Sequence, residues 1–314
     1  LITQDVAFHD LALVVCDEQH RFGVAQRAAL SAKGQTPHLL VMSATPIPRT
    51  LALIAYGDLD VSVIGELPPG RLPVDTFLIG EDKRQRLNAF IDKQCQAHHQ
   101  VYIVCPTVEE SDLDSLKSAE SFAQTLRQVV FPHRRVGLLH GKMKQADKDA
   151  ALGAFSRGET DILVATTVVE VGVDVPNATL MVIENADRFG LAQLHQLRGR
   201  VGRGNYKSYC ILINDSETEV AAQRAEIMVS TADGFVIAEK DLEIRGPGEF
   251  FGTRQHGVPD LKIANLVKHI DMLETVKEEA LAVITEDPLL ESAKYAPLRE
   301  RIIKTFKSNL DLKM

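Results

Sequence analysis

The stretch Leu11-Ala-Leu-Val-Val-Cys-Asp-Glu-Gln-His20 joins a short apolar run to two carboxylates, a glutamine and a histidine. A continuous apolar run of this length is typical of a strand that is buried on both faces, as in a parallel sheet covered by helices. Ligands bind beyond the carboxyl ends of such strands, so we expect Asp17 and Glu18 to face a crevice. The stretch therefore predicts an α/β fold with a polar site at a strand end.

Similar strands recur as far as about residue 214, and segments of helical period separate them. We predict strands over residues 11–16, 39–42, 101–105, 136–139, 162–165, 180–184 and 208–213. We predict helices over residues 82–97, 119–130, 144–157 and 191–201. This alternation predicts βαβ units, and hence parallel sheets with helices on their faces.

A boundary is predicted at residues 66–73, because Glu-Leu-Pro-Pro-Gly-Arg-Leu-Pro cannot continue a helix or a central strand. We place the C-terminal part of a first domain at residues 1–70 and a complete second domain at residues 71–215. Residues 216–314 are predicted to form a helical extension. It has a glycine-rich interruption at residues 246–257 and a long amphipathic helix over about residues 261–284.

The composition, with 45% hydrophobic and 25% charged residues, is ordinary for a globular protein. No run approaches about 18 apolar residues and no signal peptide opens the chain, so we expect a cytoplasmic monomer without membrane association. The net charge of −8 argues against a nucleic-acid partner, although a local basic track on an acidic protein would be sufficient. The four cysteines are far apart and form no Cys-x-x-Cys pair, which predicts buried thiols.

The two carboxylates at residues 17 and 18 have the placement of a Walker B element. Asp17 would hold the Mg²⁺ ion that bridges two phosphates of a nucleotide, and Glu18 would polarise the attacking water. A strand that runs out into a polar loop is the simpler explanation of an isolated Asp-Glu pair. Gln19 and His20 extend the pair to Asp-Glu-x-His, which is a much rarer pattern.

A second strand end carries hydroxyl groups, in the stretch Met42-Ser-Ala-Thr-Pro46. Ser43 and Thr45 can bond both to the carboxylates and to the neighbouring backbone. Helix capping before Pro46 is the alternative for the stretch taken alone. Its spacing from the Asp-Glu-Gln-His stretch favours the functional interpretation.

The second domain has a comparable strand end in Ala165-Thr-Thr-Val-Val-Glu-Val-Gly-Val-Asp174. Thr166 and Thr167 can offer donors to nucleic-acid phosphates, and Asp174 can accept a ribose hydroxyl. A threonine-capped short helix is the alternative interpretation.

The stretch Gln196-Leu-Arg-Gly-Arg-Val-Gly-Arg203 is predicted to place Arg200 and Arg203 three residues apart on one helical face. Arginine is suited to planar, bidentate recognition of phosphate, and such a residue can act as an arginine finger. A solvated basic helix end is the alternative, which three arginines with two spacing glycines disfavour.

In this order and at these separations, the four stretches resemble motifs II, III, V and VI of superfamily 2 helicases. The resemblance implies a truncated RecA-like domain followed by a complete RecA-like parallel-sheet domain, with ATP and Mg²⁺ in the cleft between them. It implies a metal ligand at Asp17 and catalytic roles for Asp17, Glu18, His20, Arg200 and Arg203. It also implies nucleotide contacts from Gly172, Asp174 and Gln196, and DNA contacts from Ser43, Thr45, Thr166 and Thr167.

Two longer stretches resemble the RecG family. Residues 17–24, Asp-Glu-Gln-His-Arg-Phe-Gly-Val, extend motif II as it occurs in RecG and in the translocase Mfd. Residues 234–257 are similar to the TRG element that those two translocases share. The amino-acid sequence of residues 246–255 is closer to that of RecG than to that of Mfd. The element implies a lever on duplex DNA that carries Arg245, Arg254 and Gln255. In this arrangement Arg224, in the helical segment before the element, would bond to the motif VI stretch.

This resemblance implies an ATP-dependent DNA helicase that moves on double-stranded DNA and remodels stalled forks and Holliday junctions in recombination and repair. It also implies single-strand-binding protein as a further partner. An Mfd-type translocase that pushes RNA polymerase and a non-catalytic interaction module are the alternatives. The chain contains no Gly-x-x-x-x-Gly-Lys-[Ser/Thr] phosphate loop and no wedge domain, and we expect both to precede Leu1. We therefore expect this chain alone to have negligible ATPase activity.

Overall fold

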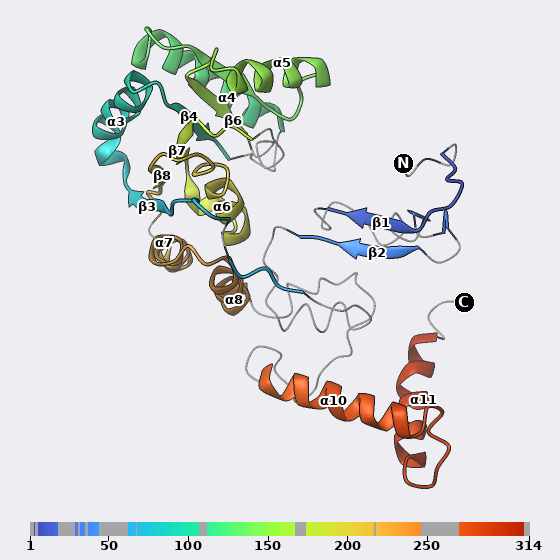
Figure 1. Ribbon diagram of the computed structural model, residues 1–314. Coiled ribbons are helices and arrows are strands. Elements are labelled where there is room, and N and C mark those ends of the chain that lie inside the picture. The colour runs from blue at the N-terminus through green and yellow to red at the C-terminus, as the bar shows by residue number, and fades with distance from the viewer. Residues whose placement is uncertain are drawn as a thin grey trace. The chain divides into compact units, whose positions relative to one another are not determined.

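A computed structural model of the chain (Figure 1) describes residues 3, 6–17, 29–30, 32–34, 37–43, 62–66, 68–106, 112–166, 174–216, 218–245 and 270–310. The chain divides into two compact units. One comprises Leu1–Pro48 with Asp60–Gly246, and the other comprises Arg49–Leu59 with Pro247–Met314.

The main element of the first unit is a six-stranded sheet in which every described pairing is parallel. In spatial order its strands are β3 (Val74–Ile79), β8 (Ser208–Ile213), β7 (Ala178–Ile183), β4 (Gln100–Val104), β6 (Ile162–Ala165) and β5 (Val136–Leu139). The central strands β4, β6 and β7 are buried along their whole length, as their near-continuous apolar sequences predict. The predicted parallel α/β class is therefore confirmed.

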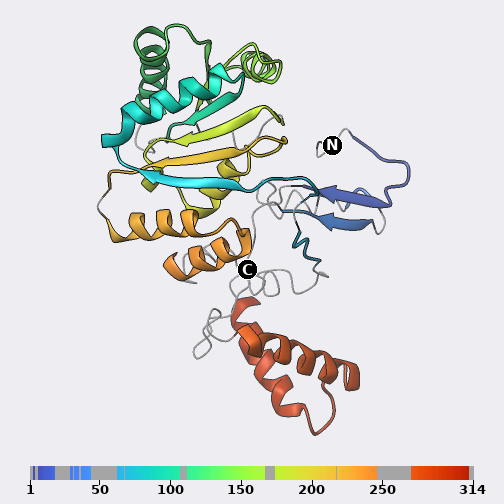
Figure 2. The same ribbon diagram turned by 60° about the vertical axis from the view of Figure 1, so that its left-hand side comes forward.

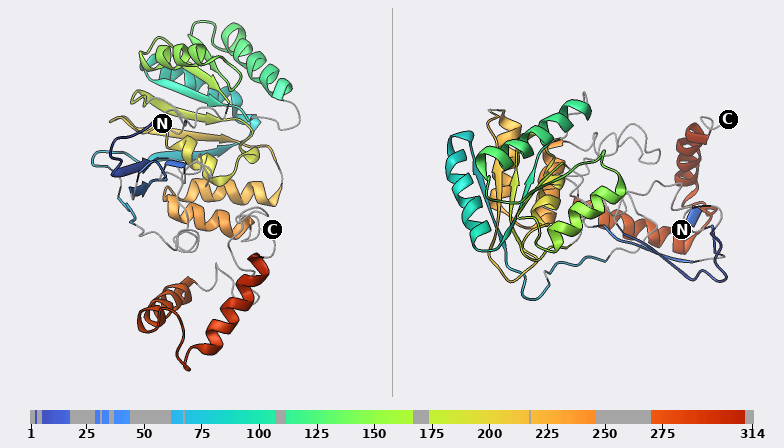
Figure 3. Two further views of the ribbon diagram at one scale, coloured as in Figure 1. Left: turned by 90° about the vertical axis from the view of Figure 1, so that its right-hand side faces the viewer. Right: turned by 90° about the horizontal axis from the view of Figure 1, so that it is seen from above.

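Helices cover both faces of this sheet, as Figures 2 and 3 show. On one face, α3 (Arg84–Gln96) and α4 (Asp112–Thr125) pack over a core that contains Ile91, Ile103 and Ile162. On the other face lie α5 (Gln145–Ser156), α6 (Leu191–Arg198), α7 (Glu219–Ser230) and α8 (Gly234–Arg245). Phe155, Leu194, Met228 and Ile237 bring one side chain from each of these four helices into that second core.

A smaller sheet precedes the large one in the chain. Its strands β1 (Leu13–Cys16) and β2 (His38–Val41) are parallel, with Val14 opposite Leu39. The Met42 amide donates to the Cys16 carbonyl at 2.8 Å, which continues the pairing to the ends of both strands. Both strand ends therefore open at the same edge, where Asp17 and Ser43 follow.

Three elements differ from the sequence prediction. The strand β3 was not predicted, because Asp75 and Thr76 interrupt its apolar run and it forms the half-exposed edge of the sheet. The helix α6 was predicted to reach residue 201, but it ends at Arg198 and Gly199 caps it. The helix predicted over residues 119–130 begins earlier, at Asp112, and its last part, Leu126–Val130, is a π-helix. The other strand and helix boundaries of the second domain differ from the prediction by about one or two residues.

The second unit contains α10 (Ile270–Glu286) and α11 (Ala296–Leu310). Asp287 caps the turn between them, because its carboxylate accepts the backbone amides of Glu291 and Ser292 at 3.2 and 2.8 Å. Part of the helix predicted over residues 261–284 is thus present, and residues 261–269 lie outside the described residues. Among the described helices, none is both long and apolar enough to span a membrane.

The cysteines are single thiols in the interior of the first unit. Cys16, Cys95 and Cys210 are buried and Cys105 is half-buried. Burial raises the pKa of Cys95, Cys105 and Cys210 to about 12, so these three thiols stay protonated at neutral pH. A role as a nucleophile or metal ligand is therefore disfavoured for them.

Candidate functional site

The parallel sheet has a carboxyl edge and an amino edge, and the predicted site residues divide between them. Thr166 follows β6 directly at the carboxyl edge, where its amide donates to the Leu139 carbonyl at 3.1 Å. Its side chain is buried. Thr167 and Gly172 lie outside the described residues. Of the two threonines predicted to contact DNA, the structure therefore describes Thr166.

Part of the carboxyl edge is occupied by an ion-pair network. At the start of α3, Arg84 donates to both oxygens of Glu184 at 2.6 and 2.7 Å, and it also donates to Glu81. The Glu184 carboxylate raises the pKa of Arg84 above its ordinary value, against the effect of burial. The charges beyond β7 therefore stabilise the packing of α3 on the sheet.

The amino edge brings together residues from two of the predicted motifs. Asp174 lies just before β7, and the helix α6 returns from the carboxyl edge so that the loop after it also lies at the amino edge. There the Arg203 Nη1 lies 3.5 Å from the Asp174 Oδ1. The Arg203 Nε donates to the Gly199 carbonyl at 3.0 Å. The structure thus pairs the predicted ribose acceptor with a predicted arginine finger.

The loop that holds these arginines is shaped by its glycines. Gly202 has a φ of +74°, and a Cβ at this position would lie 2.7 Å from the Val74 Cγ2. A Cβ at Gly204 would collide with the Pro176 carbonyl. Both positions therefore require glycine, which brings the loop close to the strand ends.

The predicted placement of the two arginines on one helical face was wrong. Because α6 ends at Arg198, Arg200 lies in the turn that follows and Arg203 lies farther along the loop. The apolar periodicity continues through Val201, but the glycine cap ends the helix before it. The two guanidinium groups therefore depend on loop geometry for their positions.

A hollow of about 540 Å³ adjoins Arg203 at this edge. It is lined by Pro176, Asn177, Arg203, Gly204, Asn205 and Tyr206. The ring of His99 lies against the Tyr206 ring, with centroids 4.7 Å apart. A cation beside a carboxylate and a surface hollow fits a nucleotide, whose phosphate suits arginine and whose ribose hydroxyl suits Asp174.

The pKa of Tyr102 reflects the charges of both arginines. Burial raises the pKa of Tyr102 to about 12, and the positive charges of Arg200 and Arg203 oppose that effect. Tyr102 lies on β4 and packs against Phe155, with ring centroids 4.7 Å apart. Asp174 acts on this pKa in the opposite direction to the two arginines, so Tyr102 is influenced by both signs of charge in this region.

One buried arginine of the same stretch was not predicted as a site residue. Arg198 is 4% exposed. Its Nη1 donates to the carbonyls of Met228 and Thr231 at 2.8 and 2.9 Å, and its Nη2 lies 3.0 Å from the His195 Nδ1. The Met228 and Thr231 partners lie some thirty residues along the chain, so no local pattern indicates them. Gln196, a predicted nucleotide contact, is half-buried on α6.

The neighbouring histidine is held neutral. Burial lowers the pKa of His195 to about 4, and the Arg198 charge adds to this effect. Arg71 also lowers this pKa, whereas Asp233 raises it. The His195 Nδ1 can therefore accept a hydrogen bond from Arg198 at neutral pH.

We expect this histidine to make the free energy of unfolding depend on pH. The unfolded chain binds the proton near the ordinary pKa of 6.5, whereas the folded chain binds it only near 4. The contribution is thus fully present above pH 6.5 and is lost as the pH falls towards 4, by up to roughly 3 kcal/mol. Urea unfolding at pH 7 and pH 4.5 should show a smaller loss for His195→Gln than for the unsubstituted chain. Equal losses would contradict this assignment.

The predicted residues of the first domain are only partly described. Asp17 is exposed directly after β1, and Ser43 lies two residues after β2 at the same edge. Glu18, His20 and Thr45 lie outside the described residues. Within the described part of the chain, no group of three His, Cys, Asp or Glu residues is suited to a metal ion. A single aspartate nevertheless fits Mg²⁺, which proteins commonly hold with one or two carboxylates together with nucleotide phosphates.

The predicted lever residues are also partly described. Arg224 lies on α7, and its buried Nε has no hydrogen-bond partner in the described structure. Arg245 is the last residue of α8, and Arg254 and Gln255 lie outside the described residues. The described bond between the motif VI stretch and α7 is made by Arg198.

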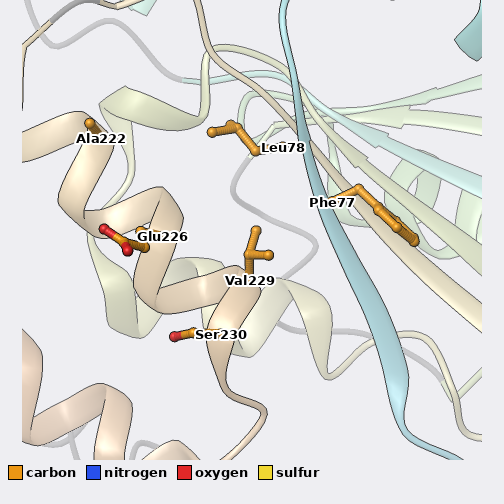
Figure 4. Close-up of a pocket in the computed structure, with 6 residues that line it drawn as sticks. All are labelled: Phe77, Leu78, Ala222, Glu226, Val229 and Ser230. Carbon is orange, nitrogen blue, oxygen red and sulfur yellow. The ribbon is translucent and has the colours of Figure 1, made fainter.

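A second pocket, of about 480 Å³, lies between β3 and α7 (Figure 4). Its lining consists of Phe77, Leu78, Ala222, Glu226, Val229 and Ser230. Apart from Glu226 it carries no charge, so it lacks the paired charges that a nucleotide requires. The candidate site is therefore the hollow beside Arg203.

Two family descriptions match parts of the chain. Residues 82–205 match the helicase conserved C-terminal domain. Residues 231–314 match the C-terminal part of domain 3 of ATP-dependent DNA helicase RecG.

Curated relatives resemble nearly the whole chain. The ATP-dependent DNA helicase RecG of Synechocystis is 52% identical over 310 residues, which are 99% of this chain and 37% of that protein. The Bacillus subtilis protein of the same name is 48% identical over 305 residues, which are 97% of this chain and 45% of that protein. The chain thus spans less than half the length of these relatives.

Two solved structures are also similar to the chain. A structure of RecG bound to a three-way DNA junction is 47% identical, with a TM-score of 0.67, over 87% of this chain and 35% of that chain. The Mycobacterium smegmatis helicase Lhr, bound to single-stranded DNA and AMP-PNP, is 18% identical with a TM-score of 0.51 over 68% of this chain and 31% of that chain. The second likeness concerns the fold alone.

Proposed function

Because the chain belongs to the RecG family of DNA helicases, we propose that it forms the second motor domain of an ATP-dependent double-stranded-DNA translocase. The Arg203–Asp174 pair beside the surface hollow is the observation that carries this proposal. It joins a phosphate-binding cation and a ribose-binding carboxylate at one edge of a RecA-like sheet. Membership of the RecG family supports the other parts of the proposal, which are ATP dependence and movement on double-stranded DNA.

In this motor, Arg203 and Arg200 would stabilise the negative charge that develops on the transferred phosphoryl group. Asp174 would hold Arg203 in place and accept a ribose hydroxyl. Asp17 would hold Mg²⁺, which neutralises phosphate charge when bound, and Glu18 and His20 would orient the attacking water. Gly172 and Gln196 would complete the nucleotide contacts.

DNA would bind at the opposite edge of the sheet. Thr166 ends β6 at the carboxyl edge, whereas the arginine loop lies at the amino edge. A movement of this domain driven by ATP would therefore move the DNA contacts of Thr166 and Thr167 relative to those of Ser43 and Thr45 in the first domain. Arg224, Arg245, Arg254 and Gln255 would carry the movement to the duplex.

We propose branched double-stranded DNA as the substrate, with remodelling of stalled forks and Holliday junctions in recombination and repair as the outcome. One relative was solved on a three-way DNA junction, which supports the branched substrate. Single-strand-binding protein is proposed as a further partner of a monomeric enzyme. The relatives named above carry RecG names, which favours this proposal over an Mfd-type translocase.

The experiment compares this chain alone with a chimera. In the chimera, the chain replaces the matching segment of the Synechocystis relative, to which it is 52% identical. We expect the chain alone to hydrolyse ATP no faster than buffer, because its 314 residues contain no phosphate loop. We expect DNA to stimulate hydrolysis by the chimera. DNA-stimulated hydrolysis by the chain alone, or none by the chimera, would overturn the proposal.

A further inference from the structure

Tyr206 is an exposed aromatic residue that lines the hollow beside Arg203. It is 54% exposed, although it lies only two residues before the largely buried strand β8. Exposure alone is ordinary for a tyrosine, because its ring is apolar and its hydroxyl group is polar. An exposed tyrosine indicates a ligand where its surroundings hold the ring and place other ligand-binding groups beside it. The surroundings of Tyr206 do both.

The Tyr206 ring is supported on one side. The His99 ring lies against it at an interplanar angle of 59°, with the two centroids 4.7 Å apart. The His99 Nδ1 lies 3.3 Å from the Asn177 Oδ1, and the Asn177 Nδ2 donates to the His98 carbonyl at 2.7 Å. Asn177 thus fixes the His99 ring, which supports Tyr206 in turn. A ring that is already held loses little conformational freedom when a flat ligand binds to its exposed side.

The chain that follows Tyr206 is fixed as well. The Ser208 hydroxyl donates to the Tyr206 carbonyl at 3.1 Å. The Lys207 Nζ lies 2.9 Å from the Asp75 Oδ2 on β3. Lys207 therefore bonds to the edge strand, whereas Tyr206 lines the hollow. This separation makes Lys207 a matched control for experiments on Tyr206.

The other parts of a nucleotide have binding groups close to this ring. Arg203 and Tyr206 both line the hollow, and three residues of chain span at most about 11 Å. The Arg203 Nη1 lies 3.5 Å from the Asp174 Oδ1, the proposed acceptor of a ribose hydroxyl. The volume of about 540 Å³ is in the range of small-molecule sites. Groups suited to a phosphate, a ribose and a flat base are therefore gathered at one hollow.

We propose that Tyr206 is a base-binding residue of the second motor domain, and that its ring stacks on the adenine of the nucleotide whose phosphate contacts Arg203. The inference rests on the proposed motor function. Stacking uses the π-faces of both rings, so it requires the aromatic ring of Tyr206 but not its hydroxyl group. Asn205 lines the same hollow, and its amide can bond to the edge of the base.

The first test measures binding of ADP to this chain alone by saturation-transfer difference NMR. Ligand protons that lie close to the protein receive the most saturation in this experiment. We expect the adenine H2 and H8 protons to receive more saturation than the ribose H1′ proton. In Tyr206→Ala the adenine signals should fall roughly fivefold or more, because removal of an aromatic partner costs a base most of its stacking.

Three further variants complete this test. Tyr206→Phe keeps the ring and should keep the adenine signals. His99→Ala removes the support of the ring, so we expect a smaller loss than in Tyr206→Ala. Lys207→Ala, the control, removes the bond to Asp75 and should change nothing. Absence of adenine signals in the unsubstituted chain, or equal signals in Tyr206→Ala, would overturn the inference.

The second test uses the Synechocystis chimera described above. ADP and ribose 5-diphosphate, which lacks the base, are compared as inhibitors of DNA-stimulated ATP hydrolysis. In Tyr206→Ala we expect the inhibition constant of ADP to rise roughly tenfold and that of ribose 5-diphosphate to stay unchanged. The KM for ATP should rise, whereas kcat at saturating ATP should change by less than about twofold. An equal rise for both inhibitors, as from a merely structural role, or no rise for either would contradict base binding.

The two tests separate the inference from the proposed function. If the unsubstituted chimera does not hydrolyse ATP, the proposed function fails, and the NMR experiment alone decides whether Tyr206 binds a base. If the chimera hydrolyses ATP but Tyr206→Ala behaves like Lys207→Ala in both tests, the inference fails and the proposed function stands.

Discussion

Replacing Arg203 with alanine in the Synechocystis chimera is expected to lower the rate of DNA-stimulated ATP hydrolysis by roughly 10³-fold or more. Arginine fingers in other nucleotide hydrolases contribute about 10³ to 10⁵ in rate, because they stabilise charge that develops in the transition state. The Arg203 guanidinium is suited to this role because it lies beside a surface hollow and 3.5 Å from Asp174. The measurement is steady-state ATP hydrolysis at saturating DNA.

Two variants complete this experiment. Arg203→Lys keeps the charge but loses the planar, bidentate geometry, so we expect it to remain severely impaired. Arg157→Ala removes an arginine that bonds to Glu159 on the exposed surface, and it should leave the rate unchanged. If Arg203→Ala hydrolysed ATP at the unsubstituted rate, the catalytic role would be wrong. A non-catalytic interaction module would then gain support.

Replacing Asp17 with asparagine is the second change with a large expected effect. A metal ion contributes several kcal/mol of charge stabilisation in such reactions, so loss of its carboxylate ligand should lower hydrolysis by roughly 10³-fold. Asp17 is exposed at the end of β1, beside the end of β2, where a parallel sheet presents ligand-binding groups. The measurement is the rate of hydrolysis by the chimera as Mg²⁺ is varied.

The control for this experiment is Asp10→Asn, which removes an exposed carboxylate seven residues earlier in the same segment. It should leave both the rate and its dependence on Mg²⁺ unchanged. For Asp17→Asn we expect a much higher Mg²⁺ requirement as well as a lower maximal rate. An unaltered Mg²⁺ dependence would show that Asp17 is not the metal ligand.

The strand ends could be predicted from the sequence because the evidence for them is local. Residues 162–165 are apolar throughout, and Thr166 follows them as the first polar residue. The strand β6 has these bounds, and Thr166 lies where the sheet ends. The same reasoning places Asp17 after β1, but the predicted burial of that strand on both faces was wrong, because Leu13 and Val15 are exposed. Burial on both faces of a parallel sheet gives such strands a continuous apolar sequence.

The edge strand β3 could not be recognised in the same way. An edge strand is only partly buried, so its sequence need not be apolar throughout, and Asp75 pairs with Lys207 on the exposed side. The prolines of residues 66–73 end directly before it, which made the whole region resemble a linker. Its pairing with β8 depends on residues more than a hundred positions later.

The arginine loop shows a different limit of sequence reasoning. Apolar residues at positions 191, 194, 197 and 201 have helical spacing, and this spacing predicted a helix through Val201. The helix is capped at Gly199, before that residue, and the positive φ of Gly202 turns the chain directly after it. The residue types of the motif were sufficient to predict a phosphate-binding role, but the position of each guanidinium is a property of the folded loop.

The partners of Arg198 could not be predicted at all. Its acceptors are backbone carbonyls of Met228 and Thr231, and any residue type provides a carbonyl. The sequence suggested Arg224 as the link between the motif VI stretch and the extension, and the structure describes a link through Arg198. The importance of this residue follows from its burial, which requires that its charge be hydrogen-bonded.

The measurement that tests the central claim most directly is strand separation by the chimera on a three-way DNA junction. We predict ATP-dependent separation of the junction, no separation of a linear duplex of equal length, and loss of the activity in Arg203→Ala. A chimera that hydrolyses ATP in the presence of DNA but leaves the junction intact would contradict the proposal that this chain is a motor domain for branched DNA.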